Sequence, residues 1–394
     1  MAEPASLRVY LHIGAPKTGT TYLQRRLFRN RAQLADDGVL YPYTDFGQSF
    51  RSMHDFCGTG WGGKQPEHFQ GQWETVASRV RSWPGSTAII SNELFGNASP
   101  ERISLGLARL GDAETHIVFT ARDFARQLVS DWQEHVKHKH TVSLEKFVDD
   151  LMTRGINAPK PFGEMFWGLH DAARVLGRWT PFVPPERIHL VTLPQPGGPP
   201  DALWRRFCAT TQLNPDRYRD LRNLANRSMG VAETEFVRRL NQRVRKVPAR
   251  DYDPVVRRLL AERVLGNRSG RLTLPPEYLD WAIERSTQLV GDLRPAGYDV
   301  VGDLDDLLPR RADHAEHIAP SQLSAQDMSP VAMRATAGLL RYSARQKRHV
   351  RELRSMLEDL PAATSSVPDQ PDATRPLSSR IRDRSRWLRN ALKN

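Results

Sequence analysis

A cluster of glycine, lysine and threonine residues near the start of the chain has the composition of an anion-binding loop. Gly14 and Gly19 bracket Lys17. Three threonines lie beside the lysine and the second glycine, namely Thr18, Thr20 and Thr21. A lysine ammonium, threonine hydroxyls and the backbone N–H groups of a glycine-rich turn can all stabilise phosphate or sulfate oxygens. This loop is therefore the first candidate for chemistry.

The sequence on either side of the loop predicts the elements that hold it. The apolar run 9–13 is typical of a buried strand. After Thr20, leucines recur at helical spacing, at Leu23, Leu27 and Leu34. A strand, a glycine-rich turn and a helix in this order direct backbone N–H groups and the positive end of the helix dipole at an anion. We expect the loop to bind a phosphate-like group.

The position of the lysine distinguishes this loop from a nucleoside-triphosphate loop. In the form G-x-x-x-x-G-K-[ST] the lysine follows the second glycine, whereas Thr20 stands there in this chain. The order Pro16-Lys17-Thr18-Gly19-Thr20-Thr21 resembles the 5′-phosphosulfate loop of sulfotransferases that use 3′-phosphoadenosine 5′-phosphosulfate (PAPS). The resemblance spans about residues 7–300. It implies that residues 16–21 bind the phosphosulfate and that Lys17 contacts the bridging oxygen as the sulfuryl group leaves.

A second anion-binding element is predicted where the strand 116–120 meets the next helix. Arg122 ends the strand, and Ser130 follows two turns into the helix. A guanidinium can donate two parallel hydrogen bonds to phosphate oxygens, and this spacing is similar to the family's 3′-phosphate motif. The resemblance also implies a polar loop over the adenine, for which Arg227 and Ser228 are candidates. The alternative for Arg122 is a surface ion pair.

Sulfuryl transfer to a hydroxyl needs a general base within hydrogen-bonding distance of that hydroxyl. Glu93 follows the strand 87–91 directly, so we expect it at the same sheet edge as Lys17. A glutamate near this location resembles the arrangement in carbohydrate sulfotransferases. Other branches of the family use a histidine, which makes His135 and His138 reserve candidates. The structural alternative for Glu93 is a carboxylate that complements a helix N-terminus.

The histidines do not predict a metal site. His135, His138 and His140 cluster, but no carboxylate or cysteine arrangement completes a recognised ligand set, so a solvated histidine face is favoured. The family mechanism needs no metal, because PAPS already carries an activated leaving group. His12, inside the first strand, is expected to be a packed core residue.

Strands alternate with helices along residues 1–310, the predicted sulfotransferase domain. After the first strand, further strands are predicted at 39–42, 87–91, 116–120 and 187–192, the last of them completing the sheet. Residues 42–69 are predicted to be a long aromatic loop. The alternation predicts an α/β fold with a doubly wound parallel sheet. The resemblance makes this a three-layer, P-loop-like fold.

After residue 310 the sequence changes character. Residues 311–360 are expected to be a helical extension, in which 329–360 has the apolar spacing of a coiled coil and can pair two copies of the chain. Residues 361–394 are expected to be a disordered linker and a basic amphipathic tail, suited to an anionic membrane or polymer. The alternative is a helix that docks on its own domain or extends into solvent.

The composition narrows the partners and the compartment. Lysine and arginine total 57 against 45 acidic residues, a net charge of +12, which fits an anionic cofactor or substrate. Two cysteines give no disulfide framework. From the short stretch before the first strand we expect no signal peptide, and the sequence has no apolar run long enough to span a bilayer. We expect a cytoplasmic protein, peripheral at the inner membrane face through its tail, and the arginine-rich composition favours a bacterial source.

These features together predict a PAPS-dependent sulfotransferase that sulfates a hydroxyl of a carbohydrate or glycosylated metabolite and releases adenosine 3′,5′-bisphosphate (PAP). The carbohydrate acceptor, on a glycan or glycolipid, rests on the resemblance and on Glu93. No nucleic-acid partner is expected. One alternative is a P-loop-type kinase or NTPase with a degenerate loop, which would bind ATP with Mg²⁺. The other is a non-catalytic protein that binds PAP without turnover.

Overall fold

The structure is a computed structural model of the 394-residue chain. It describes residues 7–59, 66–219, 228–266, 269–314 and 316–358. The chain divides into two compact units, residues 1–339 and 340–394. The division falls within the long helix α14 (Ala325–Glu358), downstream of the change in sequence character near residue 310. The predicted linker and basic tail, 361–394, lie outside the described residues.

Six parallel strands form one sheet in the first unit. They are β1 (Arg8–Gly14), β2 (Val39–Leu40), β3 (Thr87–Ser91), β4 (Glu114–Ala121), β5 (Ile188–Thr192) and β6 (Asp299–Val301). Their order across the sheet is β2-β3-β1-β4-β5-β6, and each neighbouring pair is parallel. The predicted α/β class with a doubly wound parallel sheet is confirmed.

The order of the strands explains why the first loop is a ligand-binding position. From β1 the chain builds β2 and β3 on one side of the sheet, and then crosses to build β4, β5 and β6 on the other. In such sheets the crevice at the carboxyl ends of the strands, where the order reverses, is the usual ligand site. Gly14 ends β1 at this point.

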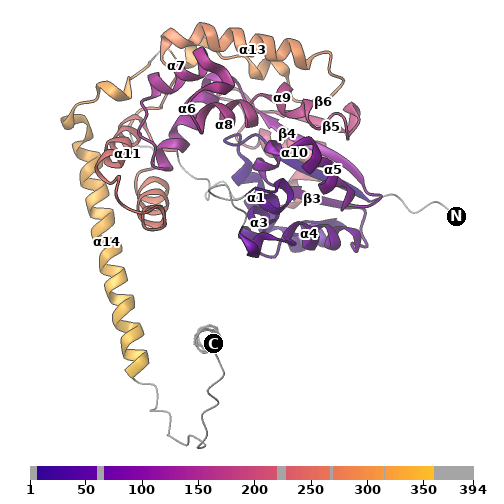
Figure 1. Cartoon of the computed structure of the whole chain (residues 1–394), viewed down its shortest axis with the longest axis horizontal. Helices are drawn as coiled ribbons and strands as arrows, with labels where there is room; N and C mark the ends of the chain where they lie inside the picture. Colours follow the sequence, from indigo (N-terminus) through magenta and orange to yellow (C-terminus); the bar gives the residue numbers. More distant parts are fainter. Residues whose placement is uncertain (1–6, 60–65, 220–227, 267–268, 315, 359–394) are drawn as a thin grey trace, which may run out of the picture. The chain divides into compact units, whose positions relative to one another are not determined.

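Helices flank the sheet on the path between strands (Figure 1). In the first half of the chain they are α1 (Thr20–Arg29), α2 (Arg31–Asp36), α3 (Phe46–Cys57), α4 (Gln72–Arg81), α5 (Pro100–Ala108), α6 (Phe124–Lys137), α7 (Leu144–Arg154), α8 (Phe162–Leu169) and α9 (Ala172–Gly177). Then come α10 (Ala202–Thr211), α11 (Val231–Arg243), α12 (Ala249–Tyr252), a π-helical segment Asp253–Val264 and α13 (Leu279–Leu293). No helix in the described part of the chain is long and apolar enough to cross a membrane.

Two of the predicted elements are corrected by the structure. The strand 187–192 does not complete the sheet, because β6 pairs with its outer edge. The segment 42–69 is not simply a loop, because it contains α3. The Asp45 side chain accepts a hydrogen bond from the Gln48 N–H at the start of α3, and Gly58 ends the helix with φ 64°. Both are sequence-readable cap signals.

The strand β1 lies at the centre of the apolar core. Val9, Leu11 and Ile13 are fully buried. His12, on the same strand, is also fully buried, and its ring nitrogens lie 2.8 Å from Ser91 Oγ and 3.3 Å from Thr120 Oγ1. Burial lowers the pKa of His12 to about 4, because the charged imidazolium would lose its hydration. The expectation of a packed core histidine is confirmed.

Candidate active site

The loop between β1 and α1 presents a run of unbonded backbone N–H groups. Among the described residues, no hydrogen-bond acceptor reaches the N–H groups of Lys17, Gly19, Thr20 or Thr21, and Gly19, the N-cap of α1, gives no side-chain cap. Lys17 (φ 64°) and Gly19 (φ 89°) have left-handed backbone conformations. Successive N–H groups in such a turn form a concave anion site, to which the α1 dipole adds.

Strand β4 holds the base of this loop. The Ala15 N–H donates to the Thr120 carbonyl at 2.8 Å, and the Thr120 hydroxyl donates to the Gly14 carbonyl at 2.8 Å. The Thr18 hydroxyl is fully buried and donates to the Ala15 carbonyl at 2.6 Å. The loop itself thus takes the hydrogen of this hydroxyl, and the assignment of Thr18 to the anion site stays a prediction. Thr20 is buried and Thr21 is half-buried.

One face of α6 runs along the loop. Gln127, Ser130 and Glu134 lie three and four residues apart, so their side chains share a face of the helix. The Gln127 amide donates to the Pro16 carbonyl at 3.0 Å, and Glu134 Oε2 lies 2.8 Å from Lys17 Nζ. Ser130 lies between these two residues on the same face of α6, and its role at the 3′-phosphate stays a prediction.

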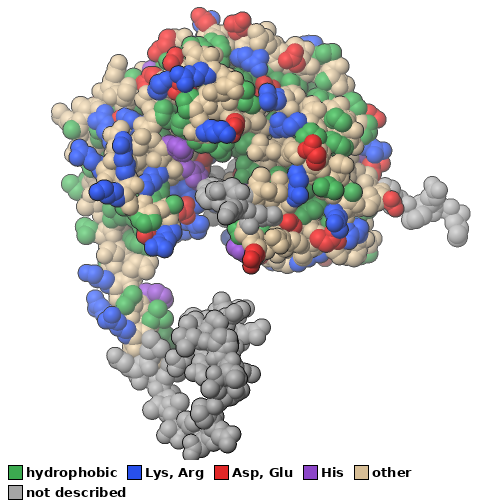
Figure 2. All heavy atoms as spheres, in the orientation of Figure 1, with side chains coloured by type: hydrophobic (Ala, Val, Ile, Leu, Met, Phe, Trp, Pro, Cys, Tyr) green, Lys and Arg blue, Asp and Glu red, His purple; other side chains and the backbone are tan. Residues whose placement is uncertain are grey.

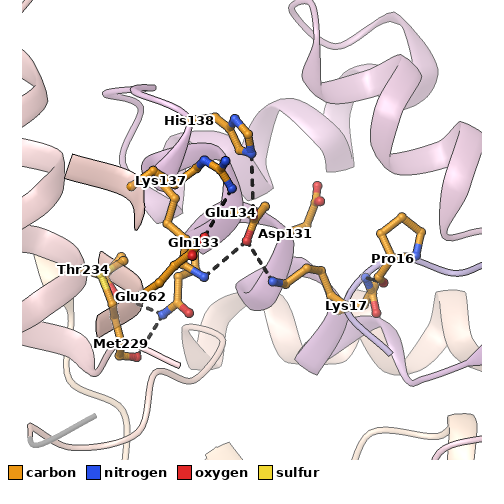
Figure 3. A network of polar contacts seen from close by, with 12 residues as sticks. Pro16, Lys17, Asp131, Gln133, Glu134, Lys137, His138, Met229, Thr234 and Glu262 are labelled. Carbon is orange, nitrogen blue, oxygen red and sulfur yellow. Dashed lines mark hydrogen bonds and ion pairs between the residues drawn. The ribbon is translucent and has the colours of Figure 1, made fainter. Parts of the chain in front are cut away.

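Glu134 is the centre of a polar cluster at Lys17 (Figure 3). Its Oε2 also lies 3.3 Å from Lys137 Nζ, and its Oε1 lies 3.4 Å from His138 Nε2. Burial opposes ionisation of Glu134, but Lys17, His138 and Lys137 hold its pKa well below the usual range. The carboxylate is therefore charged at neutral pH. The sequence motifs did not identify Glu134, whose only sequence signal is its position one turn after Ser130.

Arg122, at the end of β4, has hydrogen-bonding capacity that the described residues do not fill. Its Nη2 donates to the Arg126 carbonyl at 2.9 Å, and its Nε is buried without a hydrogen-bond partner. Within the described residues no carboxylate lies at ion-pair distance from it. Burial lowers the pKa of Arg122 to about 10. The Arg122 side chain as a whole is half-buried. A buried guanidinium nitrogen without an acceptor is costly, and this argues against a surface ion pair as the role of Arg122.

Glu93 lies at the sheet edge where the sequence placed it. It begins a short 3₁₀ turn, Glu93–Asn97, directly after β3, and a Cβ on Gly14 would come within 3.3 Å of its carbonyl oxygen. Its Oε2 accepts a 2.7 Å hydrogen bond from Gln24 Nε2 of α1. Asn92, not Glu93, caps the turn by accepting from the Leu94 N–H. The role of Glu93 as a base stays a prediction.

The two reserve bases, His135 and His138, differ in their exposure to solvent. His135 is buried, with Nε2 3.3 Å from Asp131 Oδ2 and its ring against Phe147 and Phe162. It therefore has no open path to an acceptor. His138 is exposed and lies in the Lys17 cluster through Glu134. Of the two histidines, His138 has the better position for proton transfer.

The predicted adenine loop is only partly described. Arg227 lies outside the described residues, and Ser228 is exposed. The adjoining Met229 carbonyl accepts a 2.9 Å hydrogen bond from Gln133 Nε2, whose amide also donates to Thr234 Oγ1 at 3.0 Å (Figure 3). Gln133 precedes Glu134 on α6, so this contact brings the segment that begins at Ser228 toward the candidate site.

Other chemistries find no support in the described part of the chain. It contains no group of three or more His, Cys, Asp and Glu residues arranged to hold a metal ion. Cys57 and Cys208 are both buried and unpaired. On the face drawn in Figure 2, Lys and Arg side chains are interspersed with acidic and apolar ones and do not form one continuous basic patch.

Comparisons with known proteins give one weak likeness. No family model matches the sequence, and no curated protein matches it. A solved structure described as a sulfotransferase from Alicyclobacillus acidocaldarius is 17% identical, with a TM-score of 0.37 over 55% of this chain and 83% of its own. This TM-score is too low for the likeness to support a function. The function has to be inferred from the site.

Proposed function

We propose that the protein is a PAPS-dependent sulfotransferase that sulfates a hydroxyl of a carbohydrate or glycosylated acceptor. The observation that carries the proposal is a pair of candidate anion sites at the ends of adjacent parallel strands. The loop after β1 offers free N–H groups and Lys17, and the turn after β4 offers Arg122, whose Nε is buried without a hydrogen-bond partner. PAPS has two anionic ends, and these sites match them.

The chain's residues would divide the chemistry as follows. PAPS supplies a sulfuryl group on an activated phosphate leaving group. Residues 16–21 would hold the phosphosulfate end, through the free N–H groups that follow Pro16, and Arg122 with Ser130 would bind the 3′-phosphate. Glu93 would take the proton of the acceptor hydroxyl. Lys17 would offset the negative charge that develops on the leaving phosphate oxygen.

Calorimetric titration with PAP in the absence of metal tests this proposal. Wild type is expected to bind PAP saturably, and Arg122→Ala to bind it about tenfold or more weakly, since a charged hydrogen-bond donor is lost. Lys17→Ala is expected to affect PAP less, because PAP lacks the sulfuryl group. Arg205→Ala, which removes an exposed surface arginine paired with Asp201 and Asp216, is the control.

The outcomes separate the alternatives. Tighter binding of ATP with Mg²⁺ than of PAP would overturn the proposal in favour of a nucleotide kinase or NTPase. PAP binding without transfer to any member of a glycan, glycolipid and glycoside panel would instead favour a non-catalytic PAP-binding protein.

A further inference from the structure

Two lysines share one carboxylate oxygen at the candidate site (Figure 3). Lys17 Nζ lies 2.8 Å and Lys137 Nζ 3.3 Å from Glu134 Oε2. One lysine comes from the loop after β1 and the other from the last turn of α6. Because both ammonium groups contact the same oxygen, they are neighbours, even though the two residues are far apart in the sequence.

The negative charge near the two lysines does not balance their two positive charges. Among the described residues, Glu134 is the carboxylate within ion-pair distance of either lysine. Glu262 acts on Lys137 from farther away, and its Oε1 is already 3.2 Å from Arg257 Nη1. Two ammonium groups on one carboxylate repel each other, and in a partly buried place this repulsion is weakly screened. An arriving anion would relieve it.

Lys137 is much less exposed to solvent than a typical surface lysine. Its side chain is only 11% exposed, although a lysine usually keeps its ammonium in water. Its position at the end of α6 suits a cation, because the carboxyl end of a helix dipole is negative. That dipole explains why Lys137 is tolerated there. It does not explain why the ammonium points toward the carboxylate that holds the loop lysine.

We propose that Lys137 is a second sulfonate-binding residue, which contacts the sulfuryl group of bound PAPS from α6 while Lys17 contacts it from the loop. This inference rests on the proposed sulfotransferase function. It adds no new bond-making step: Lys137 binds and orients the sulfuryl oxygens, and its ammonium keeps its proton. Because PAP lacks the sulfuryl group, Lys137 has no ligand of its own in the PAP complex.

The difference between PAPS and PAP tests the assignment. Both nucleotides are titrated into wild type, Lys137→Met and Lys137→Arg, without acceptor. Lys137→Met is expected to weaken PAPS binding about tenfold or more and PAP binding by no more than about twofold. Lys137→Arg, which keeps the charge, is expected to restore most of the PAPS affinity. Lys146→Met, at a surface lysine paired with Asp150, is the matched control.

The possible outcomes are distinct. An equal loss for PAPS and PAP in Lys137→Met, or no loss for either, would overturn the role of Lys137 and leave the proposed function standing. Failure of wild type to bind either nucleotide would overturn the proposed function and this inference with it. Thermal unfolding of each variant distinguishes a local loss of binding from loss of the fold.

Discussion

The side-chain amide of Gln127 connects the candidate loop to a buried histidine. Its Nε2 donates to the Pro16 carbonyl at 3.0 Å and lies 2.8 Å from His170 Nδ1. Since the amide donates, Nδ1 accepts, and the ring hydrogen is on Nε2, which lies 3.2 Å from Asp131 Oδ1. Burial alone would raise the pKa of Asp131, but His170 and His135 hold it below its usual range. The loop is thus braced by a buried polar chain.

This brace predicts the effect of Gln127→Ala. The Pro16 carbonyl and His170 Nδ1 would each lose a partner in a buried place, so the free energy of unfolding is expected to fall by about 1–3 kcal/mol. PAP affinity is expected to fall about tenfold, because the loop is no longer held in its binding shape. Denaturant unfolding and calorimetry measure the two effects. Gln288→Ala, on the exposed face of α13, should change neither, and wild-type PAP binding by Gln127→Ala would contradict the bracing role.

Gly19 is predicted to tolerate no side chain. Its φ of 89° is unfavourable for other residues, and an added Cβ would overlap Leu203 Cδ2. Gly19→Ala is expected to destabilise the fold by about 1–3 kcal/mol and to weaken PAP binding at least about tenfold. Gly71→Ala, at φ 75° with open space around it, measures the backbone strain alone.

The double variant Gly19→Ala/Leu203→Ala separates the two contributions at this position. It is expected to relieve the clash but not the strain at φ 89°, so it should bind PAP more weakly than Leu203→Ala alone. Equal PAP affinity in the two variants would show that only the Leu203 contact matters.

Glu93→Gln is predicted to separate binding from transfer. The amide keeps an oxygen for Gln24 but cannot take the acceptor's proton, so the transfer rate should fall about 10²–10⁴-fold while PAP affinity stays close to wild type. Transfer of radiolabelled sulfate from PAPS to an acceptor panel measures the rate. His138→Asn is the paired variant: an active Glu93→Gln protein with an inactive His138→Asn protein would move the base to the histidine.

Buried His12 predicts how stability depends on pH. Its pKa is about 4 in the fold and about 6.5 in the unfolded chain. Between these values the unfolded state binds a proton that the folded state does not, so the free energy of unfolding falls as the pH is lowered from about 6.5 to about 4. One such group contributes up to about 1.4 kcal/mol per pH unit.

Urea unfolding of wild type and His12→Gln across this range checks the prediction. In the variant, the slope of the free energy of unfolding against pH is expected to be smaller by the equivalent of about one bound proton. His140, whose pKa burial also lowers to about 4, contributes in the same window and gives a comparison variant, His140→Gln. An unchanged slope in His12→Gln would show that the unfolding reaction does not sense this histidine.

The sequence by itself was enough to predict the features that depend on a local pattern of residues. Continuous apolar runs identified β1, β3, β4 and β5, because strands buried on both faces of a parallel sheet need apolar residues throughout. Glycine and lysine placement identified the loop after β1. The strand order was not predicted, yet parallel strands bring all their carboxyl ends to one edge. That alone was sufficient to expect Glu93 and Arg122 beside the loop.

Only the tertiary structure decided the contacts between distant segments. The strand β6 is three residues long and partly exposed, so its pairing with β5 leaves little trace in the sequence. Glu134 and Lys137 resemble ordinary helix-surface charges until α6 is packed against the loop, where both come within reach of Lys17. Spacing along a chain determines which face of a helix a side chain occupies. What that face meets depends on how the elements pack.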